Sequence, residues 1–148
     1  MEESKDNSTA SFLRAEKTAL RLVARAEQNT GGLARKLERR GHDSAVVSEV
    51  ISRLCEQNLL NDTRFAVLWL QSRLRFARSP RRLLSSLCAK GIDRDTAETA
   101  LKTVLNEDTE TALLERFAKK YARGTHPIKY LLKSEGFSIA AINKFTDE

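Results

Sequence analysis

The sequence repeats one hydrophobic pattern three times, and this repeat limits the fold more than any other feature. A shift of 50 residues places 33–54 over 83–104, and a further shift of 45 brings the segment from residue 128 into the same frame. Because residues i and i+4 lie on the same side of a helix, an apolar pair at this spacing predicts a helix that buries one face. Each copy carries such a pair: Leu33/Leu37, Leu83/Leu87 and Ile128/Leu132.

A glycine and then a polar residue follow each apolar pair. A glycine can adopt the left-handed conformation that ends a helix, and a side-chain oxygen two residues later can cap the next helix. The pattern predicts a tight corner between two helices at Gly41/Asp43, Gly91/Asp93 and Gly136/Ser138. The helix after each corner is expected to bury the aligned residues Val47, Val50, Ile51 and Leu54, then Ala97, Ala100, Leu101 and Val104, then Ile142 and Phe145.

A longer helix is expected to lead each copy, at about 12–28, 63–77 and 108–123. In the second copy Asp62 is placed to cap this helix, and Ser79 with Pro80 ends it and begins the next. Helical spacing predicts buried stripes at Phe65, Leu68, Trp69, Ser72 and Phe76, and at Leu113, Phe117 and Tyr121. The aromatic residues are interpreted as core, with platforms for base stacking as the alternative.

Three copies of three helices predict an all-α fold, an elongated, curved array of three tandem three-helix repeats. The expected boundaries are a disordered tail at 1–11 and repeats at 12–60, 61–106 and 107–148, the last with a truncated final helix. A single globular core of nine helices is the alternative. Two prolines and six glycines leave few interruptions, which favours helix throughout.

The net charge of +6 is concentrated in the middle of the chain. Residues 61–92 carry seven basic side chains and one acidic one, whereas the two flanks together carry 19 of each sign. A helix that is merely solvated usually combines both signs in i,i+4 pairs. The segment therefore favours a surface for a polyanion or an acidic protein over the alternative of a solvated face.

The candidate binding residues follow from this charge. Five arginines surround the Ser79–Pro80 corner, and basic residues recur on the corresponding helix of the other copies. We expect contacts with a partner or with DNA at Arg73, Arg75, Arg78, Arg81, Arg82, Lys90, Arg35, Arg39, Lys129 and Lys133.

No residues combine into a catalytic or metal-binding pattern. His42 and His126 lie in separate predicted loops without a second ligand at metal spacing, and no glycine-rich phosphate-binding motif occurs. Apolar runs are too short to cross a bilayer, and the polar N-terminus does not resemble a signal peptide. We expect a cytoplasmic, monomeric protein that is not an enzyme and needs no cofactor or metal.

A unit of three helices with a glycine turn also resembles a helix-turn-helix DNA-binding domain, whose third helix would enter the major groove. The expected third helices, however, are rich in acids, with Asp93, Asp95 and Glu98 in one copy and Glu49 and Glu56 in another. Phosphates repel such helices. Sequence-specific reading of the major groove is therefore disfavoured.

One block resembles the RecX family of regulatory proteins, which modulate the bacterial recombinase RecA. The first copy, "LARKLERRGHD", is similar to the LxxKLxxKG segment of that family. The more specific likeness lies in 59–92, and it is carried by Leu60, Asp62, Arg64, Phe65, Ala66, Trp69, Arg73, Pro80, Arg81, Lys90, Gly91 and Ile92.

The resemblance implies a non-enzymatic array of three-helix repeats that binds RecA and its nucleoprotein filament. It further implies inhibition of the recombinase, ATPase and coprotease activities in DNA repair, recombination and the SOS response, together with weak, non-specific binding of single- or double-stranded DNA. A stand-alone, non-sequence-specific DNA-binding protein is the alternative, and a structural scaffold is a third hypothesis.

Overall fold

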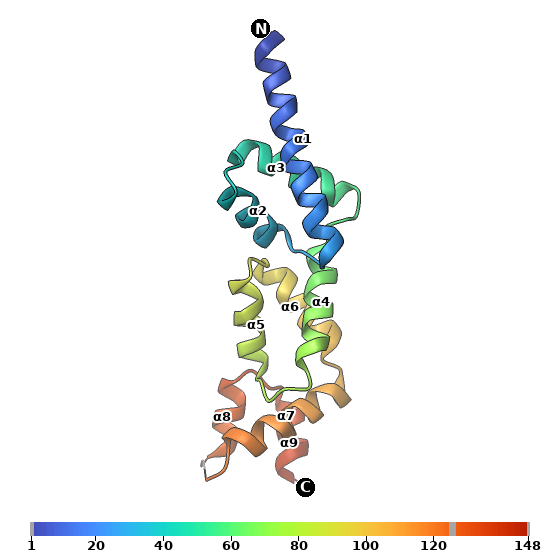
Figure 1. The fold of residues 1–148 in the computed structure, drawn as a ribbon. Helices are drawn as coiled ribbons and strands as arrows, with labels where there is room; N and C mark the ends of the chain where they lie inside the picture. Colours follow the sequence, from blue (N-terminus) through green and yellow to red (C-terminus); the bar gives the residue numbers. More distant parts are fainter. Residues whose placement is uncertain (1, 125–126, 148) are drawn as a thin grey trace. The chain divides into compact units, whose positions relative to one another are not determined.

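The computed structural model describes residues 2–124 and 127–147. Within these ranges the chain is all-α, with nine helices and no strand. His126, considered above as a metal ligand, lies outside the described residues. The helices follow one another as α1 (Glu2–Arg25), α2 (Thr30–Arg39), α3 (Ser44–Glu56), α4 (Asp62–Arg73), α5 (Pro80–Ala89), α6 (Arg94–Val104), α7 (Glu107–Tyr121), α8 (Ile128–Ser134) and α9 (Ile139–Asp147) (Figure 1).

The repeated apolar frame is confirmed at most positions, whereas Ile51, Leu101, Ile128 and Phe145 are only half-buried. The side chains of Leu33, Leu37, Leu83, Leu87 and Leu132 are fully buried. The same holds, within a few per cent of exposure, for the helix that follows each corner, where the buried residues are Val47, Val50, Leu54, Ala97, Ala100, Val104 and Ile142. The repeat therefore specifies which helix faces form the core.

The corners also have the predicted backbone. The φ angles are +91° at Gly41, +97° at Gly91 and +92° at Gly136, in the left-handed region that ends a helix at low cost for glycine. The caps differ between copies: the Asp93 carboxylate accepts a hydrogen bond from the Thr96 N–H and the Ser138 hydroxyl accepts one from Ala141. Asp43 occupies the cap position without such a bond.

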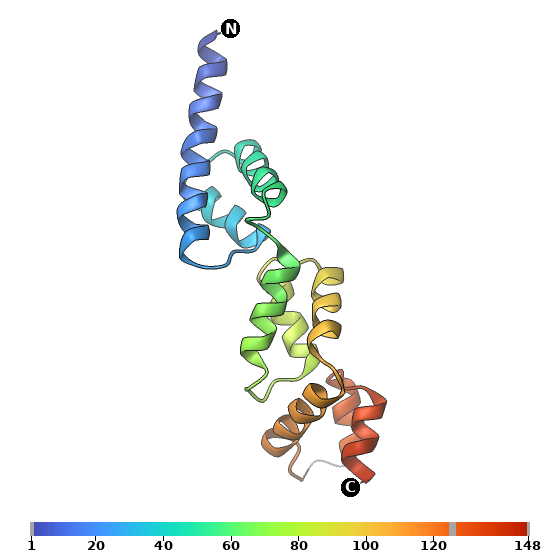
Figure 2. The same cartoon turned by 90° about the vertical axis from the view of Figure 1, so that its right-hand side faces the viewer.

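The described part of the expected disordered tail, residues 2–11, is helical in the structure. Residues 2–11 continue α1, which is anchored through the buried Ala15 and Ala19. Figures 1 and 2 both show α1 extending beyond α2 and α3. Once one end of a helix is packed, each further turn adds without a new nucleation cost, and acidic residues at 2 and 3 favour the helix N-terminus.

The predicted stripe of α4 is also wrong in part. Leu68 is 49% exposed and Phe76 lies beyond the helix end, while Ala66 and Leu70 are fully buried. Apolar residues occur all around this helix, so the helical period does not single out one face. Tertiary packing selects the face.

Contacts between residues divide the chain into two compact units, 1–65 with 90–92, and 66–89 with 93–148. In the first unit α1 packs on α2 and α3 around one core, which Leu60 completes. In the second unit α5 packs on α6, and α9 packs on α7 and α8 (Figure 2). The predicted repeat boundaries at 60/61 and 106/107 fall between helices.

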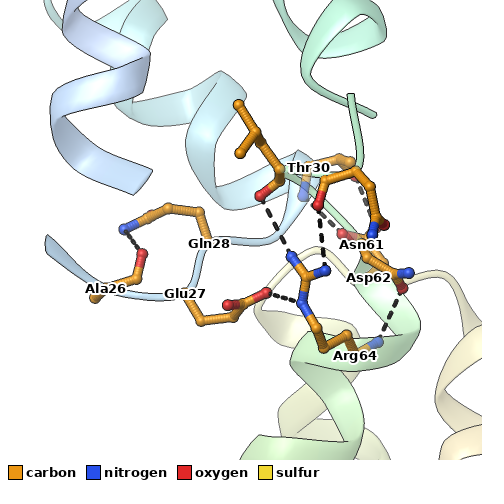
Figure 3. A network of polar contacts seen from close by, with 9 residues as sticks. Ala26, Glu27, Gln28, Thr30, Asn61, Asp62 and Arg64 are labelled. Atoms are coloured by element: carbon orange, nitrogen blue, oxygen red, sulfur yellow. Dashed lines mark hydrogen bonds and ion pairs between the residues drawn. The ribbon is translucent and has the colours of Figure 1, made fainter. Parts of the chain in front are cut away.

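The prediction that Asp62 caps α4 is wrong, as the hydrogen bonds of the first unit show (Figure 3). The side chain of Asn61, not Asp62, accepts a hydrogen bond from the Arg64 N–H, at 2.9 Å. The Asp62 carboxylate instead accepts from the N–H and the hydroxyl of Thr30, at 2.8 and 2.7 Å. Arg64 also pairs with Glu27 at 2.6 Å. Asp62 is thus held by the start of α2, because Thr30 offers it two donors.

Among the described residues, no helix combines the length and the apolar composition that a membrane span requires.

Candidate anion-binding cleft

The predicted basic corner exists and is built by a helix stop and a helix start. The last residue of α4 is Arg73, and α5 begins at Pro80. The fully buried Ser79 caps α5 by accepting a hydrogen bond from the Arg82 N–H at 3.3 Å. Proline at the first helical position has no N–H to leave unpaired, so this start is locally favourable. The corner therefore exposes several arginines from a short stretch of chain.

A cleft of about 650 Å³ lies at this corner, entirely within the second unit. Its lining contains no acidic residue. The lining residues are five cations, two aromatic rings and three small residues: Arg73, Arg78, Arg81, Arg82, Lys120, Phe76, Tyr121, Ala77, Ser85 and Ser86. The chemistry of this set suits an anion that also carries a flat, apolar group.

Arg73 is a packing residue of the cleft wall. Its guanidinium carbon lies 5.4 Å from the ring centroid of Trp69 and 6.0 Å from that of Phe76. Its Nε is buried and has no hydrogen-bond partner among the described residues. Arg73 is half-buried, so its stem and charge hold the two rings in place more than they face solvent.

Arg81 is already engaged by an acid. The Glu135 carboxylate, at the C-terminal end of α8, accepts hydrogen bonds from the Ser79 hydroxyl at 2.6 Å and from Arg81 Nη2 at 3.1 Å. The backbone joins as well, because the Arg81 N–H donates to the Glu135 carbonyl at 3.0 Å. Part of the predicted binding cluster therefore holds the protein together.

The Glu135 carboxyl has a shifted pKa. Burial by itself raises this pKa, but the hydrogen bonds from Ser79 and Arg81, and the charges of Arg81 and Arg82, together outweigh burial. The pKa of Glu135 is consequently lower than that of an ordinary glutamate. Arg81 is thus paired with an ionised carboxylate at neutral pH.

Three cations of the lining have no acidic partner in the described part of the chain. They are Arg78, Arg82 and Lys120, called here the cleft cations, and no ion pair is formed by any of them. Arg75 is exposed at the same corner, 4.9 Å from the Phe76 ring centroid, but it does not line the cleft. The cleft therefore keeps a positive field, which Glu135 offsets only in part through its electrostatic interaction with Arg82.

The remaining predicted residues do not join this cleft. Lys129 and Lys133 are exposed on α8 in the same unit. In the first unit Arg39 is exposed, and Arg35 donates a hydrogen bond to the Lys90 carbonyl at 2.7 Å. Arg35 thus also has a structural contact.

Two lining residues on α7, Lys120 and Tyr121, were not among the predicted site residues. Tyr121 was assigned to the core, yet its side chain is 46% exposed. The core closes one turn earlier, where Phe117 is buried and its ring centroid lies 5.6 Å from that of Phe137. The sequence signal for this contribution is the pair Lys119 and Lys120, of which only Lys119 has an acid, Glu115, four residues earlier. A third α7 residue, Arg116, donates to the carbonyl of Leu74 and so fastens the corner to α7.

Fold and cleft together define a class: a protein of tandem three-helix domains that carries a basic binding surface. Comparison with known proteins identifies one family. Residues 15–54 match the family pattern described as "RecX, first three-helix domain", and residues 61–101 match "RecX, second three-helix domain". The chain belongs to the RecX family.

Individual relatives agree with this assignment. Regulatory protein RecX of Treponema pallidum is 34% identical over 134 residues, covering 88% of this chain and 82% of that protein. Regulatory protein RecX of Halorhodospira halophila is 40% identical over 92 residues, covering 62% and 54%. The crystal structure of RecX from Lactobacillus salivarius has a similar fold, with a TM-score of 0.73, 22% identity, and coverage of 94% and 96%.

Proposed function

We propose that the protein binds the RecA recombinase and its nucleoprotein filament, and that it lowers the recombinase, ATPase and coprotease activities in DNA repair and recombination. Family membership supports a regulatory role. The observation that carries the proposal is the cleft with three cations that form no ion pair among the described residues. A filament of protein and DNA offers acidic side chains and phosphates, both of which such a cleft attracts. A cytoplasmic location is part of the same proposal, because the recombinase filament is formed on cellular DNA.

The experiment is inhibition of DNA-dependent ATP hydrolysis by RecA. The variant Arg78→Glu with Arg82→Glu reverses two cleft cations that form no ion pair, so we expect inhibition to be lost while helix content is kept. Lys17→Glu, on an exposed position of α1, is the matched charge control and should inhibit like the original protein. Unchanged inhibition by the double variant would contradict the site assignment.

Arg81 needs separate treatment because its side chain contacts Glu135. Reversing Arg81 changes the binding surface and the packing of α5 at once. The variant Glu135→Gln removes the ion pair and keeps every cation, so it measures the structural part alone. If Glu135→Gln abolishes inhibition as fully as Arg78→Glu with Arg82→Glu, folding rather than surface charge explains the effect.

A pulldown with RecA, with and without single-stranded DNA, distinguishes the proposal from a stand-alone DNA-binding role. Binding to RecA supports the proposal. Binding to DNA alone, with a salt dependence of about 0.7 to 0.9 per phosphate contacted, and no retention by RecA, would favour the alternative.

A further inference from the structure

The cleft contains two aromatic rings that the core does not use. Phe76 is 41% exposed and Tyr121 is 46% exposed, and both line the cleft beside the cations. Burial of an aromatic ring removes a large apolar area from water, so two exposed rings in one cleft leave apolar area that a ligand can cover. A protein surface that only attracts acids needs cations and no exposed rings. Cations and exposed rings together therefore favour a ligand that carries negative charge and a flat aromatic group.

We propose that this cleft is a nucleic-acid subsite selective for single strands. The cleft cations hold the phosphates, and Tyr121 stacks against an unpaired base. This deepens the proposed function, because it assigns the cleft to the DNA of the nucleoprotein filament. The inference rests on one part of the proposed function, namely that the protein meets DNA.

The geometry around Tyr121 suits stacking. Its ring lies 5.0 Å from the buried ring of Phe117, tilted by 42°, which supports the tyrosine from the core side. The Lys120 ammonium lies 5.1 Å from the Tyr121 ring centroid. This ammonium lies over the Tyr121 ring, so a base stacks on the ring once Lys120 turns from it to a phosphate of the same strand. Sequence-tolerant binding of single strands elsewhere combines the same two elements, a cationic groove and aromatic side chains.

The size and charge of the cleft fit this ligand. A volume of about 650 Å³ lies within the range of sites that hold a small organic group such as a nucleotide. Arg78 and Arg82 reach the cleft from the loop before α5 and from α5 itself, and Lys120 reaches it from α7. Cations from separate elements can follow a strand that enters and leaves.

Selectivity for single strands follows from the ring. In a duplex every base is stacked on its neighbours, so a tyrosine ring finds no open face and only the phosphate contacts remain. In a single strand the base can turn out and stack. The cations therefore contribute to both forms, whereas Tyr121 contributes to the single strand alone.

The test measures fluorescence anisotropy of the full protein with three probes and no recombinase: a short oligothymidylate, the matching duplex, and an abasic strand of equal length. We expect Tyr121→Ala to weaken binding of oligothymidylate about 5-fold or more, and to leave duplex and abasic strand unchanged. Tyr121→Phe keeps the ring and should restore affinity for oligothymidylate. Tyr130→Ala, which removes the 75% exposed tyrosine of α8 outside the cleft, is the matched control and should bind all three probes like the original protein.

A second variant examines the phosphate contacts. Replacing Arg82 by alanine should weaken all three probes and lower the salt slope for the single strand by about 0.7. Circular dichroism and thermal melting of each variant check that helix content is kept. The proposal is overturned if Tyr121→Ala weakens all three probes equally, if it weakens none, or if Tyr121→Phe fails like alanine.

Failure of this proposal and failure of the proposed function are distinguishable. If Tyr121→Ala binds oligothymidylate normally but Arg78→Glu with Arg82→Glu loses retention by DNA-free RecA, the cleft binds acidic protein and the regulatory function stands. If Tyr121→Ala loses only the single strand while RecA is never retained, the subsite stands and the recombinase proposal is wrong.

Discussion

The starts of α2 and α5 occupy equivalent positions in the repeat, yet they are held by different chemistry. Thr30 and Pro80 are the first residues, and Asn29 and Ser79 are the buried caps. In each case one carboxylate from a later element contacts the start: Asp62 reaches Thr30 and Glu135 reaches Ser79. The donors change between the two starts. The two acids are not at equivalent positions of the repeat, because the shift of 45 residues that aligns Gly91 with Gly136 places Lys90 over Glu135.

The first residue explains the change. Thr30 offers an N–H and a hydroxyl, so Asp62 is satisfied by neutral donors. Proline has no N–H, so at Pro80 the acid must find other donors. Glu135 finds the hydroxyl of Ser79 and the guanidinium of Arg81.

The second residue of each helix explains why the start of α5 carries a cation and the start of α2 does not. A Cβ on Gly31 would lie 2.9 Å from the carbonyl oxygen of Gly91, so that position has no room for a side chain. The equivalent position in the second copy is Arg81, whose side chain is exposed. Glycine or arginine at this position thus decides whether the helix start packs closely against a neighbouring backbone or presents an exposed cation.

The largest effect is expected from filling the glycine against which α5 packs. A Cβ on Gly136 would lie 3.2 Å from the Arg81 nitrogen and 3.4 Å from Pro80 Cβ, and φ is +92°. Gly136→Ala should lower the free energy of unfolding by more than about 2 kcal/mol, because left-handed strain of roughly 1–2 kcal/mol is joined by this close contact. Gly41→Ala has the same strain at φ +91° with no atom near the added carbon, so it should cost about 1 kcal/mol less. Equal losses in urea denaturation would show that α5 does not depend on this contact.

The next effect compares the two acids directly. Glu135→Ala leaves the fully buried Ser79 hydroxyl without its acceptor and Arg81 without its acid, and it should cost about 1–3 kcal/mol. Asp62→Ala removes the contacts to Thr30, which is only half-buried, so water can replace them and the loss should be smaller. Chemical denaturation of both variants measures the difference, and a larger loss for Asp62→Ala would reverse the ranking.

Low pH should reduce the stability that Glu135 gives to the start of α5. Its pKa is lower in the folded protein than in the unfolded chain, so its contribution is complete above the ordinary glutamate value of about 4.3. That contribution declines as the pH falls below this value and through the lower pKa of the folded state. The difference in free energy of unfolding between the original protein and Glu135→Gln should therefore shrink with acidification below about pH 4.3. A difference that stays constant from neutral pH into this range would contradict the ionised pairing.

The smallest effect concerns the two adjacent arginines. Arg81→Ala should cost about 0.5–1 kcal/mol, because the partner Glu135 is buried but the guanidinium side chain is 61% exposed. Arg82→Ala should change stability by less than about 0.5 kcal/mol, as exposed residues without specific partners do. Thermal melts of the two variants resolve this split between a structural and a binding arginine. The split is wrong if Arg82→Ala destabilises more.

The local sequence pattern was sufficient to predict the repeated apolar frame. Leu33, Leu83 and Gly136 were predicted correctly, because an i,i+4 pair and a glycine corner are properties of one short segment. The face of α4 was not predictable, because apolar residues surround that helix. Tyr121 was wrongly placed in the core, because spacing alone does not show where a core ends.

The sequence by itself determined the all-α class, the three-copy frame, the corner at Ser79 and Pro80, and the excess of positive charge beside it. These depend on neighbours within a few turns of the chain. Only the tertiary structure decided which of these charges are available, since Glu135 is 54 residues from Arg81 and Lys120 is 38 residues from Arg82 along the chain. Charge is a local property, but its neutralisation depends on which distant side chains fold against it.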